Sequence, residues 1–396
     1  MPPNGSPPPR AGGLLPGLPA RSPDERHRTA TPLELFFDLC FVTAVAQAGA
    51  RLVHAVADDH VAHGVGGYAV VFFAIWWAWM NFTWFASAYD DDGPLYRITT
   101  LVQIAGVLVL AAGIPRAFEH ADLSIAVAGY IVMRLAMCFQ WLRAASGETG
   151  AARVVALRYA AGLALVQAWW VLLLFLPHGF VWWGFAIGVI GELAVPVVAE
   201  RARRTNWHPH HIAERYGLFT IIVIGETVTA ATVAVQSALD DQAGLVHLLP
   251  IAAGGLLIVF AAFWIYFAAP VAGHLTSTRR ALAWGYGHYL IFASAAAIGA
   301  GLEVAVEETE HKAHVSTPVA SGAVTVPAAL YLVTVWALHA RHVKRDAAEQ
   351  SVLPVAAVLV LACTFAGHWA VPLAGLACVA AVAAGVALAA RSLPAR

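Results

Sequence analysis

The sequence predicts an all-α membrane protein, a polytopic bundle of about twelve transmembrane helices. Hydrophobic residues make up 60% of the 396-residue chain and charged residues only 12%, about half of the roughly 25% that is typical of soluble domains. Apolar runs of about twenty residues recur along the chain, and this is the length at which a helix crosses the hydrocarbon core. Runs such as VVFFAIWWAWM do not alternate in polarity, so the pattern favours helices over the strands of a membrane barrel.

Twelve segments have the length and apolar composition of membrane spans. They are expected at residues 33–54, 67–88, 98–117, 122–142, 155–176, 179–199, 214–237, 247–269, 282–305, 318–340, 352–368 and 370–390. The turn signals LPHG and GHWAVP separate the closest neighbours. Residues 1–30 contain eight prolines together with Gly and Ser, and we expect them to form a disordered tail.

The distribution of basic residues predicts the orientation. If the N-terminus is cytoplasmic, 19 of the 23 Lys and Arg residues fall in the tail or in cytoplasmic loops. This bias indicates an even number of spans, with both termini on the cytoplasmic side of the plasma membrane. The net charge is −1, so there is no basic field that would attract nucleic acid.

The two halves of the chain resemble each other weakly. Glu34, at the start of the first span, has a counterpart 180 residues later in Glu214, at the start of the seventh. We therefore expect a first six-helix half over 31–205 and a second over 206–396. Halves with six helices each would be parallel repeats.

Two carboxylates open the first apolar run, TPLELFFDLCFVTAVAQ. Glu34 and Asp38 are one helical turn apart and share a helix face. An ionised carboxylate at membrane depth costs roughly 2.5–3.5 kcal/mol, so both side chains are expected to face the bundle interior and to meet Arg97 or Arg134. The plainer alternative is an interfacial Glu34 with Asp38 in a static ion pair.

Several stretches resemble signatures of the bacterial low-temperature-requirement A family. They are PLELFFDLCFVTAVAQ at the first span, YDDDGPLYR after the Trp-rich second span and HHIAERYGLFTIIVIGETV at the seventh, with a weaker match in GYGHYLIFASAAAIGAGLE. Two positions depart from the expected pattern, Ala88 before the acidic loop and Ala268 after WIYF. The resemblance implies an integral membrane protein linked by name to growth in the cold, and it implies no molecular activity.

Other ionisable residues lie deep in predicted spans. Glu226 is nearest the middle of the seventh span, Glu192 lies in the sixth, Arg134 in the fourth and His288 in the ninth. Such residues are functional candidates by default, here for a substrate or ion pathway. The alternative is a static Glu–Arg pair that holds helices together. The aromatic run WWAWMNFTWFASAY is assigned to the interfacial belt in preference to a ligand cage.

Two polar clusters lie near the predicted cytoplasmic rim. Asp90, Asp92 and Arg97 suggest a Mg²⁺ and phosphate site, although most acidic runs are solvated loops. A second, weaker candidate is a Zn²⁺ site at His210, His211 and Glu214, where a solvated helix start is the simpler interpretation.

These patterns favour a secondary carrier over an enzyme. Glu34, Asp38 and Glu226 would form its polar core, with Arg134 as counter-charge and no cofactor. One alternative is a membrane-embedded enzyme acting on a lipid or isoprenoid diphosphate with Mg²⁺. Another is a structural or sensory protein needed in the cold. The expected partners are the lipid bilayer and an unidentified small molecule or ion, and a homo-oligomer is left open.

Overall fold

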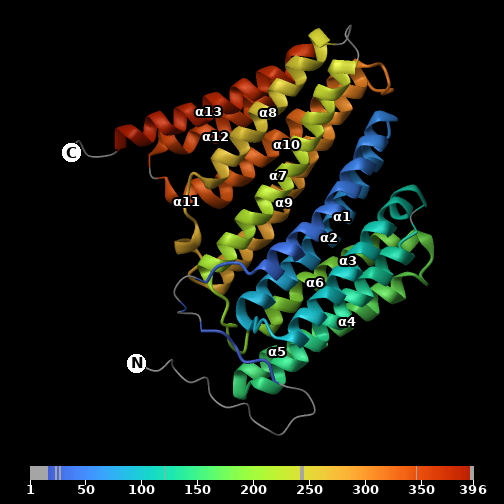
Figure 1. Cartoon of the computed structure of the whole chain (residues 1–396), viewed down its shortest axis with the longest axis vertical. Coiled ribbons are helices and arrows are strands. Elements are labelled where there is room, and N and C mark those ends of the chain that lie inside the picture. The colour runs from blue at the N-terminus through green and yellow to red at the C-terminus, as the bar shows by residue number, and fades with distance from the viewer. Residues whose placement is uncertain are drawn as a thin grey trace. The chain divides into compact units, whose positions relative to one another are not determined.

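A computed structural model describes residues 17–22, 25, 28–120, 122–240, 245–344 and 346–392 of the chain (Figure 1). The described residues form helices and turns and contain no strand. Twelve of the helices have 17 or more residues. These helices are α1 Pro32–Ala57, α2 Val61–Tyr89, α3 Pro94–His120, α4 Ser124–Gly147, α5 Gly150–Leu173, α6 Val181–Ala199, α7 Pro209–Asp240, α8 Leu245–Phe267, α9 Thr278–Thr309, α10 Thr317–Val335, α12 Ala347–Cys363 and α13 Ala370–Ser392.

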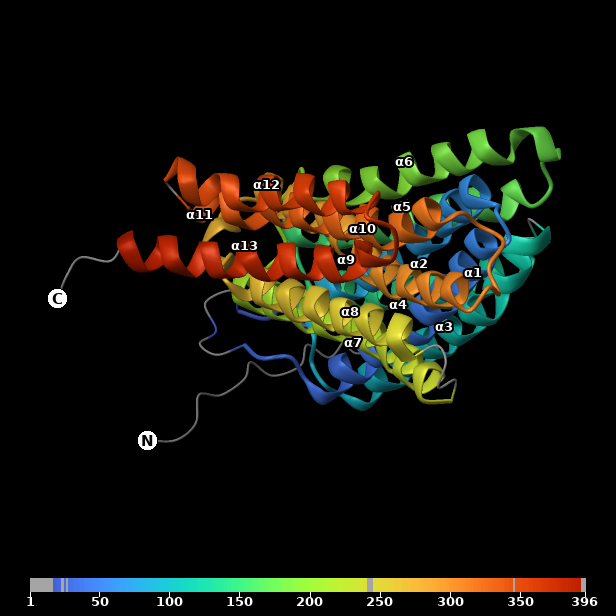
Figure 2. The ribbon, with the colours of Figure 1, turned by 90° about the horizontal axis from the view of Figure 1, so that it is seen from above.

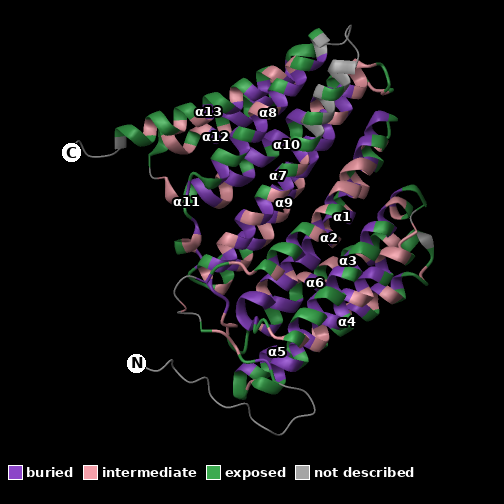
Figure 3. Cartoon of the chain, viewed as in Figure 1, coloured by how far each residue is buried: buried purple, intermediate pink, exposed green. Residues whose placement is uncertain are grey.

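Each predicted span overlaps one of these helices, which confirms an all-α polytopic membrane bundle. Ten helical segments in the described residues are long and apolar enough to cross a membrane, α12 is a shorter apolar helix, and α7 lies outside both groups. Many large apolar side chains are exposed, among them Phe175, Trp183 and Phe365. Figure 3 shows exposed residues along the long helices. Such surfaces are expected of helices that face lipid, because acyl chains are as apolar as the side chains.

Local sequence signals explain where several helices begin. α1, α3 and α7 each start at a proline, whose fixed φ and missing N–H suit the first helical position. Ser277 and Asp346 cap α9 and α12, because each side chain accepts a hydrogen bond from a backbone N–H of the first turn.

The chain divides into two compact units. The first contains residues 1–40 and 78–212, and the second contains 41–77 and 213–396. The units differ from the predicted halves 31–205 and 206–396, since residues 41–77 pack with the later part of the chain. The prediction of an internal repeat concerns symmetry, and it stays a prediction.

In the first unit, α3 packs on α4, α4 on α5 and α5 on α6. The α3–α4 contact depends on glycine: a Cβ atom on Gly129 would clash with the backbone nitrogen of Leu110, and one on Gly113 would lie 2.6 Å from that of Ala126. Small residues let helix backbones approach closely, so this contact is specified by the sequence.

In the second unit, α9 packs on α10, α8 on α13 and α12 on α13. The α12–α13 pair lies side by side in both views (Figures 1 and 2). After Val335 the chain continues as a π-helical turn, Trp336–Ala340, and the short helix α11, Arg341–Val343.

The expectation of a disordered tail over 1–30 does not hold for its described residues. Leu18 and Arg28 are buried. The Leu18 N–H donates to the Arg143 carbonyl at 3.1 Å, and the Arg21 N–H donates to the Ala88 carbonyl at 2.8 Å. Composition missed this packing because single apolar and basic residues in a Pro-rich segment can still find partners on folded helices. Residues 1–16, 23, 24, 26 and 27 lie outside the described residues.

Candidate functional site

The carboxylate of Glu34 closes a capping box at the start of α1. The Thr31 N–H donates to Glu34 Oε2 at 2.7 Å, and the Glu34 N–H donates to Thr31 Oγ1 at 3.3 Å. This reciprocal pair satisfies two backbone donors that the first helical turn leaves open. The capping box is one reason why an acidic residue stands at the start of this apolar helix. Glu34 is nevertheless fully buried, so its charge needs compensation as well.

That compensation comes from Arg28 and His211. Arg28 Nη2 lies 3.6 Å from Glu34 Oε1 and 3.6 Å from Asp90 Oδ2, and it also donates to the Ala86 carbonyl. His211 Nε2, from the first turn of α7, lies 3.2 Å from Glu34 Oε1. All four side chains are buried. We call Arg28, Glu34, Asp90 and His211 the buried charge cluster.

The buried charge cluster contains one guanidinium against two carboxylates. Arg21 approaches Asp90 at 3.9 Å, but it is partly exposed and its guanidinium pairs at 2.6 Å with Glu25. Burial and the nearby Glu34 carboxylate raise the pKa of Asp90 above its ordinary value. The cluster therefore places a guanidinium, which stays charged, beside an imidazole, whose charge depends on whether it holds a proton.

His208 caps the start of α7, the helix that carries His211. It directly precedes Pro209, the first residue of α7. Its ring Nδ1 accepts a hydrogen bond from the His211 backbone N–H at 3.3 Å, as an N-cap side chain does. The backbone N–H of His208 donates to Ser87 Oγ at 3.0 Å. Burial lowers the pKa of His208, which favours the neutral ring that this acceptor role requires.

Asp38 is fully buried, but it meets neither predicted partner. The Trp79 indole N–H donates to Asp38 Oδ1 at 2.6 Å. Trp76, Trp77 and Trp79 are all buried, so the assignment of this part of the aromatic run to an interfacial belt is wrong. These rings are buried because large aromatic side chains fill space between packed helices. Trp79 also supplies an N–H donor for the buried Asp38 carboxylate.

Each aspartate of the acidic loop lies near a different arginine. Asp90 faces Arg28, Asp91 lies 3.5 Å from Arg143, and Asp92 lies 2.6 Å from Arg97. Asp90 and Asp91 also accept the backbone N–H groups two residues later, those of Asp92 and Gly93, which is an Asx-turn geometry. The loop is therefore built from local turns and three separate ion pairs.

The predicted Mg²⁺ and phosphate rim is not assembled in this arrangement. Both oxygens of Asp92 accept hydrogen bonds from Arg97, and the two side chains are 51% and 58% exposed. Asp90 instead points to Arg28, and Asp38 is held by Trp79. The three groups that an enzyme at this rim would need, Asp38, Asp92 and Arg97, do not converge.

The weaker metal candidates have different surroundings: His211 faces Glu34, and His210 is exposed. Within the described ranges, no group of three or more His, Cys, Asp or Glu side chains is arranged to hold a metal ion.

Arg134 pairs with Glu192 and not with Glu34 or Asp38. Its Nη2 donates to Glu192 Oε1 at 2.9 Å. The Trp170 indole N–H donates to the same oxygen at 3.0 Å, and the guanidinium lies 5.0 Å from the ring centre of Tyr130. α4, α5 and α6 thus meet at one buried pair. This geometry corresponds to the static lock that the sequence left as an alternative.

Glu226 and His288 belong to the second unit. Glu226 on α7 is half-buried, and no hydrogen bond or ion pair joins it to another described residue. His288 is fully buried. Its Nδ1 lies 2.8 Å from the Trp284 carbonyl, which can only accept, so Nδ1 carries the hydrogen and Nε2 accepts from the Tyr266 hydroxyl at 3.1 Å. His339 Nε2 lies 3.4 Å from His288 Nε2.

Sequence reasoning missed Arg28, Trp79 and the pairing of His211 with Glu34. The T-x-x-E pattern at Thr31 was available as a capping-box signal. Nothing in the sequence pointed to Arg28, because its Pro-rich surroundings predicted disorder.

Comparison with known proteins gives one family. A family model described as "Bacterial low temperature requirement A protein (LtrA)" matches residues 29–388. An uncharacterized protein of Rhizobium meliloti (strain 1021) is 32% identical over 204 residues, which are 49% of this chain and 48% of that protein. The aligned part spans about half the length of this curated relative.

Proposed function

The chain belongs to the bacterial low temperature requirement A (LtrA) family, and we propose that it is a proton-coupled secondary carrier. The family gives the membrane context but no activity, so the proposal depends on the chemistry of the buried charge cluster. Its substrate in this proposal is a small molecule or ion.

One observation carries the proposal: the 3.2 Å contact between His211 and Glu34, with Arg28 and Asp90 as the other charged members of the cluster. Histidine changes charge in the physiological pH range. Gain or loss of one proton changes the net charge of the buried charge cluster, and a charge change inside a low-dielectric site shifts the relative stability of conformations. This is the property that links proton movement to transport.

The Arg134–Glu192 pair provides the contrast. Its acid accepts hydrogen bonds from a guanidinium and from an indole N–H. Such a pair stabilises a packing arrangement. The buried charge cluster differs because its second cation is a titratable imidazole.

We propose the plasma membrane as the location, with both termini cytoplasmic. The support is the distribution of Lys and Arg in the sequence, because positive loops remain inside. In this orientation the buried charge cluster lies near the cytoplasmic ends of its helices.

The proposal is tested by charge movement without a known substrate. Proteoliposomes adsorbed on a solid-supported membrane receive an external pH step from about 7.5 to about 6.5, which spans the ordinary range of histidine. We expect a transient current in the wild type that protein-free liposomes lack. The variant Glu34→Gln should reduce this current to the protein-free level, because the carboxylate that favours the His211 proton is gone.

Arg97→Gln is the matched control, because it removes an exposed arginine in the first turn of α3 and should leave the current unchanged. A wild-type current equal to that of protein-free liposomes would contradict the carrier proposal.

A further inference from the structure

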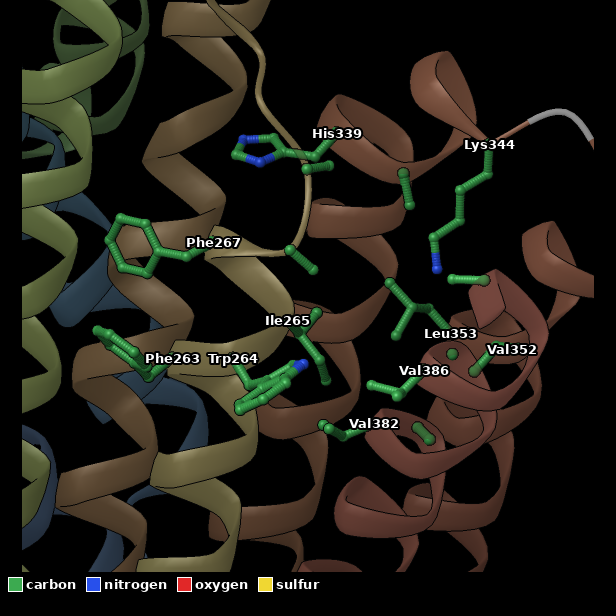
Figure 4. Close-up of a pocket in the computed structure, with 16 residues that line it drawn as sticks. Phe263, Trp264, Ile265, Phe267, His339, Lys344, Val352, Leu353, Val382 and Val386 are labelled. Carbon is green, nitrogen blue, oxygen red and sulfur yellow. The ribbon is translucent and has the colours of Figure 1, made fainter. Parts of the chain in front are cut away.

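The second unit contains a cavity that is unrelated to the buried charge cluster. It has a volume of about 420 Å³ and is lined by residues of α8, the π-helical turn, α12 and α13 (Figure 4). Its walls are largely apolar, with Phe263, Trp264 and Phe267 on one side and Leu353 and Val386 on the other. A cavity of this size lies within the range of small-ligand sites.

The apolar rim of the cavity is turned outward. Trp264 is 54% exposed and Val386 is 50% exposed. In a membrane-spanning bundle these surfaces contact acyl chains. The cavity is therefore accessible to a lipid chain from the side.

Lys344 adds one positive charge to this apolar cavity. It follows α11 and lines the cavity, and Figure 4 shows its side chain directed toward Leu353 and Val386. A Cβ atom built on Gly385 would lie 3.7 Å from Lys344 Nζ. None of the described residues that line the cavity is acidic. Among the described residues Lys344 Nζ makes no hydrogen bond or ion pair, and the neighbouring Asp346 is used as the N-cap of α12.

An ammonium beside an apolar surface is stabilised by an anion at the membrane interface. A ligand that satisfies both features has a hydrocarbon chain and an anionic head group. The sequence-based orientation places Lys344 at the cytoplasmic leaflet, whose anionic lipids are attracted to basic residues, and basic pockets between helices on that side bind such head groups.

We propose that this cavity binds an anionic phospholipid of the surrounding bilayer. Its phosphate contacts Lys344 and one acyl chain occupies the space between Trp264, Leu353 and Val386. Gly385 leaves room for the chain, because the Lys344 ammonium is the one described group outside α13 that lies within 4 Å of the position that its Cβ would take. The site belongs to one compact unit and is independent of proton coupling.

Native mass spectrometry of the purified full-length protein tests the site. The protein is titrated with phosphatidylglycerol and with phosphatidylcholine that carry the same acyl chains. We expect preferential binding of phosphatidylglycerol, and Lys344→Gln should weaken it about fivefold, the effect of one basic residue near a lipid surface. Lys344→Arg should retain the preference, and Arg279→Gln, an exposed arginine in the first turn of α9, is the control.

Gly385→Phe separates the acyl-chain contact from the charge, because the ring would fill the cavity. It should weaken binding of both lipids. Unchanged phosphatidylglycerol binding in either Lys344→Gln or Gly385→Phe would overturn the proposal. Displacement of phosphatidylglycerol by equimolar palmitate would also overturn it, since a free fatty acid would then be the better ligand.

Discussion

Replacing Arg134 with Met is expected to lower the free energy of unfolding by about 3–5 kcal/mol, because it leaves the Glu192 carboxylate buried without its cation. Glu192 is 1% exposed and accepts hydrogen bonds from Arg134 and from Trp170. The Trp170 indole donor does not neutralise the charge. Thermal unfolding of the purified variant measures the loss, with Arg153→Met on the exposed face of α5 as the control for a surface substitution.

The double variant Arg134→Met with Glu192→Gln separates the cost of an unpaired charge from the loss of packing. Gln keeps an acceptor for the Trp170 N–H but carries no charge, so the double variant should recover most of the stability. If Arg134→Met unfolds at the wild-type temperature, or if the second substitution restores nothing, this pair is not a lock.

Arg28→Gln is expected to have an effect of similar size, roughly 3–5 kcal/mol near neutral pH. The substitution removes the cation that lies 3.6 Å from both Glu34 and Asp90. The two buried carboxylates then lose the guanidinium that lies near both of them. Thermal stability in detergent, measured beside the exposed-pair variant Arg97→Gln, gives the difference.

The loss in Arg28→Gln should depend on pH, with a sign set by the carboxylates. The pKa of Asp90 is already raised by burial and by Glu34, and removing Arg28 favours the protonated acid further. A carboxyl group whose pKa is higher in the folded state destabilises the fold as pH rises from its unfolded value, near 4, through its folded value. Arg28→Gln should therefore approach wild-type stability at about pH 5 and lose most at about pH 8. A loss that is equal at both pH values would contradict this account.

The helices were predictable from the sequence because their signal is local. Span length and apolar composition located each helix, but the seventh span was predicted from residue 214, whereas α7 begins at Pro209. The position of Glu34, Asp38 and Glu192 within apolar spans predicted that their side chains face the protein interior. All three are buried.

The identities of those partners were not predictable, because they depend on tertiary packing. Arg134 lies 58 positions before Glu192 in the sequence, and any of several acids in neighbouring spans was an equal candidate. Arg28 was hidden by a Pro-rich context that argues for disorder. The acidic loop was misleading for another reason: three adjacent aspartates suggest one cation site, but their carboxylates lie near three different arginines.

The protonation state of His211 tests the central claim most directly. Nitrogen NMR of protein labelled with ¹⁵N-histidine identifies its resonance as the one missing in His211→Gln. We predict that this resonance changes from the imidazole to the imidazolium form, in exchange with solvent, as pH is lowered from about 9 to about 5. A His211 resonance that keeps one protonation state over this whole range would contradict a proton-coupled role for the buried charge cluster.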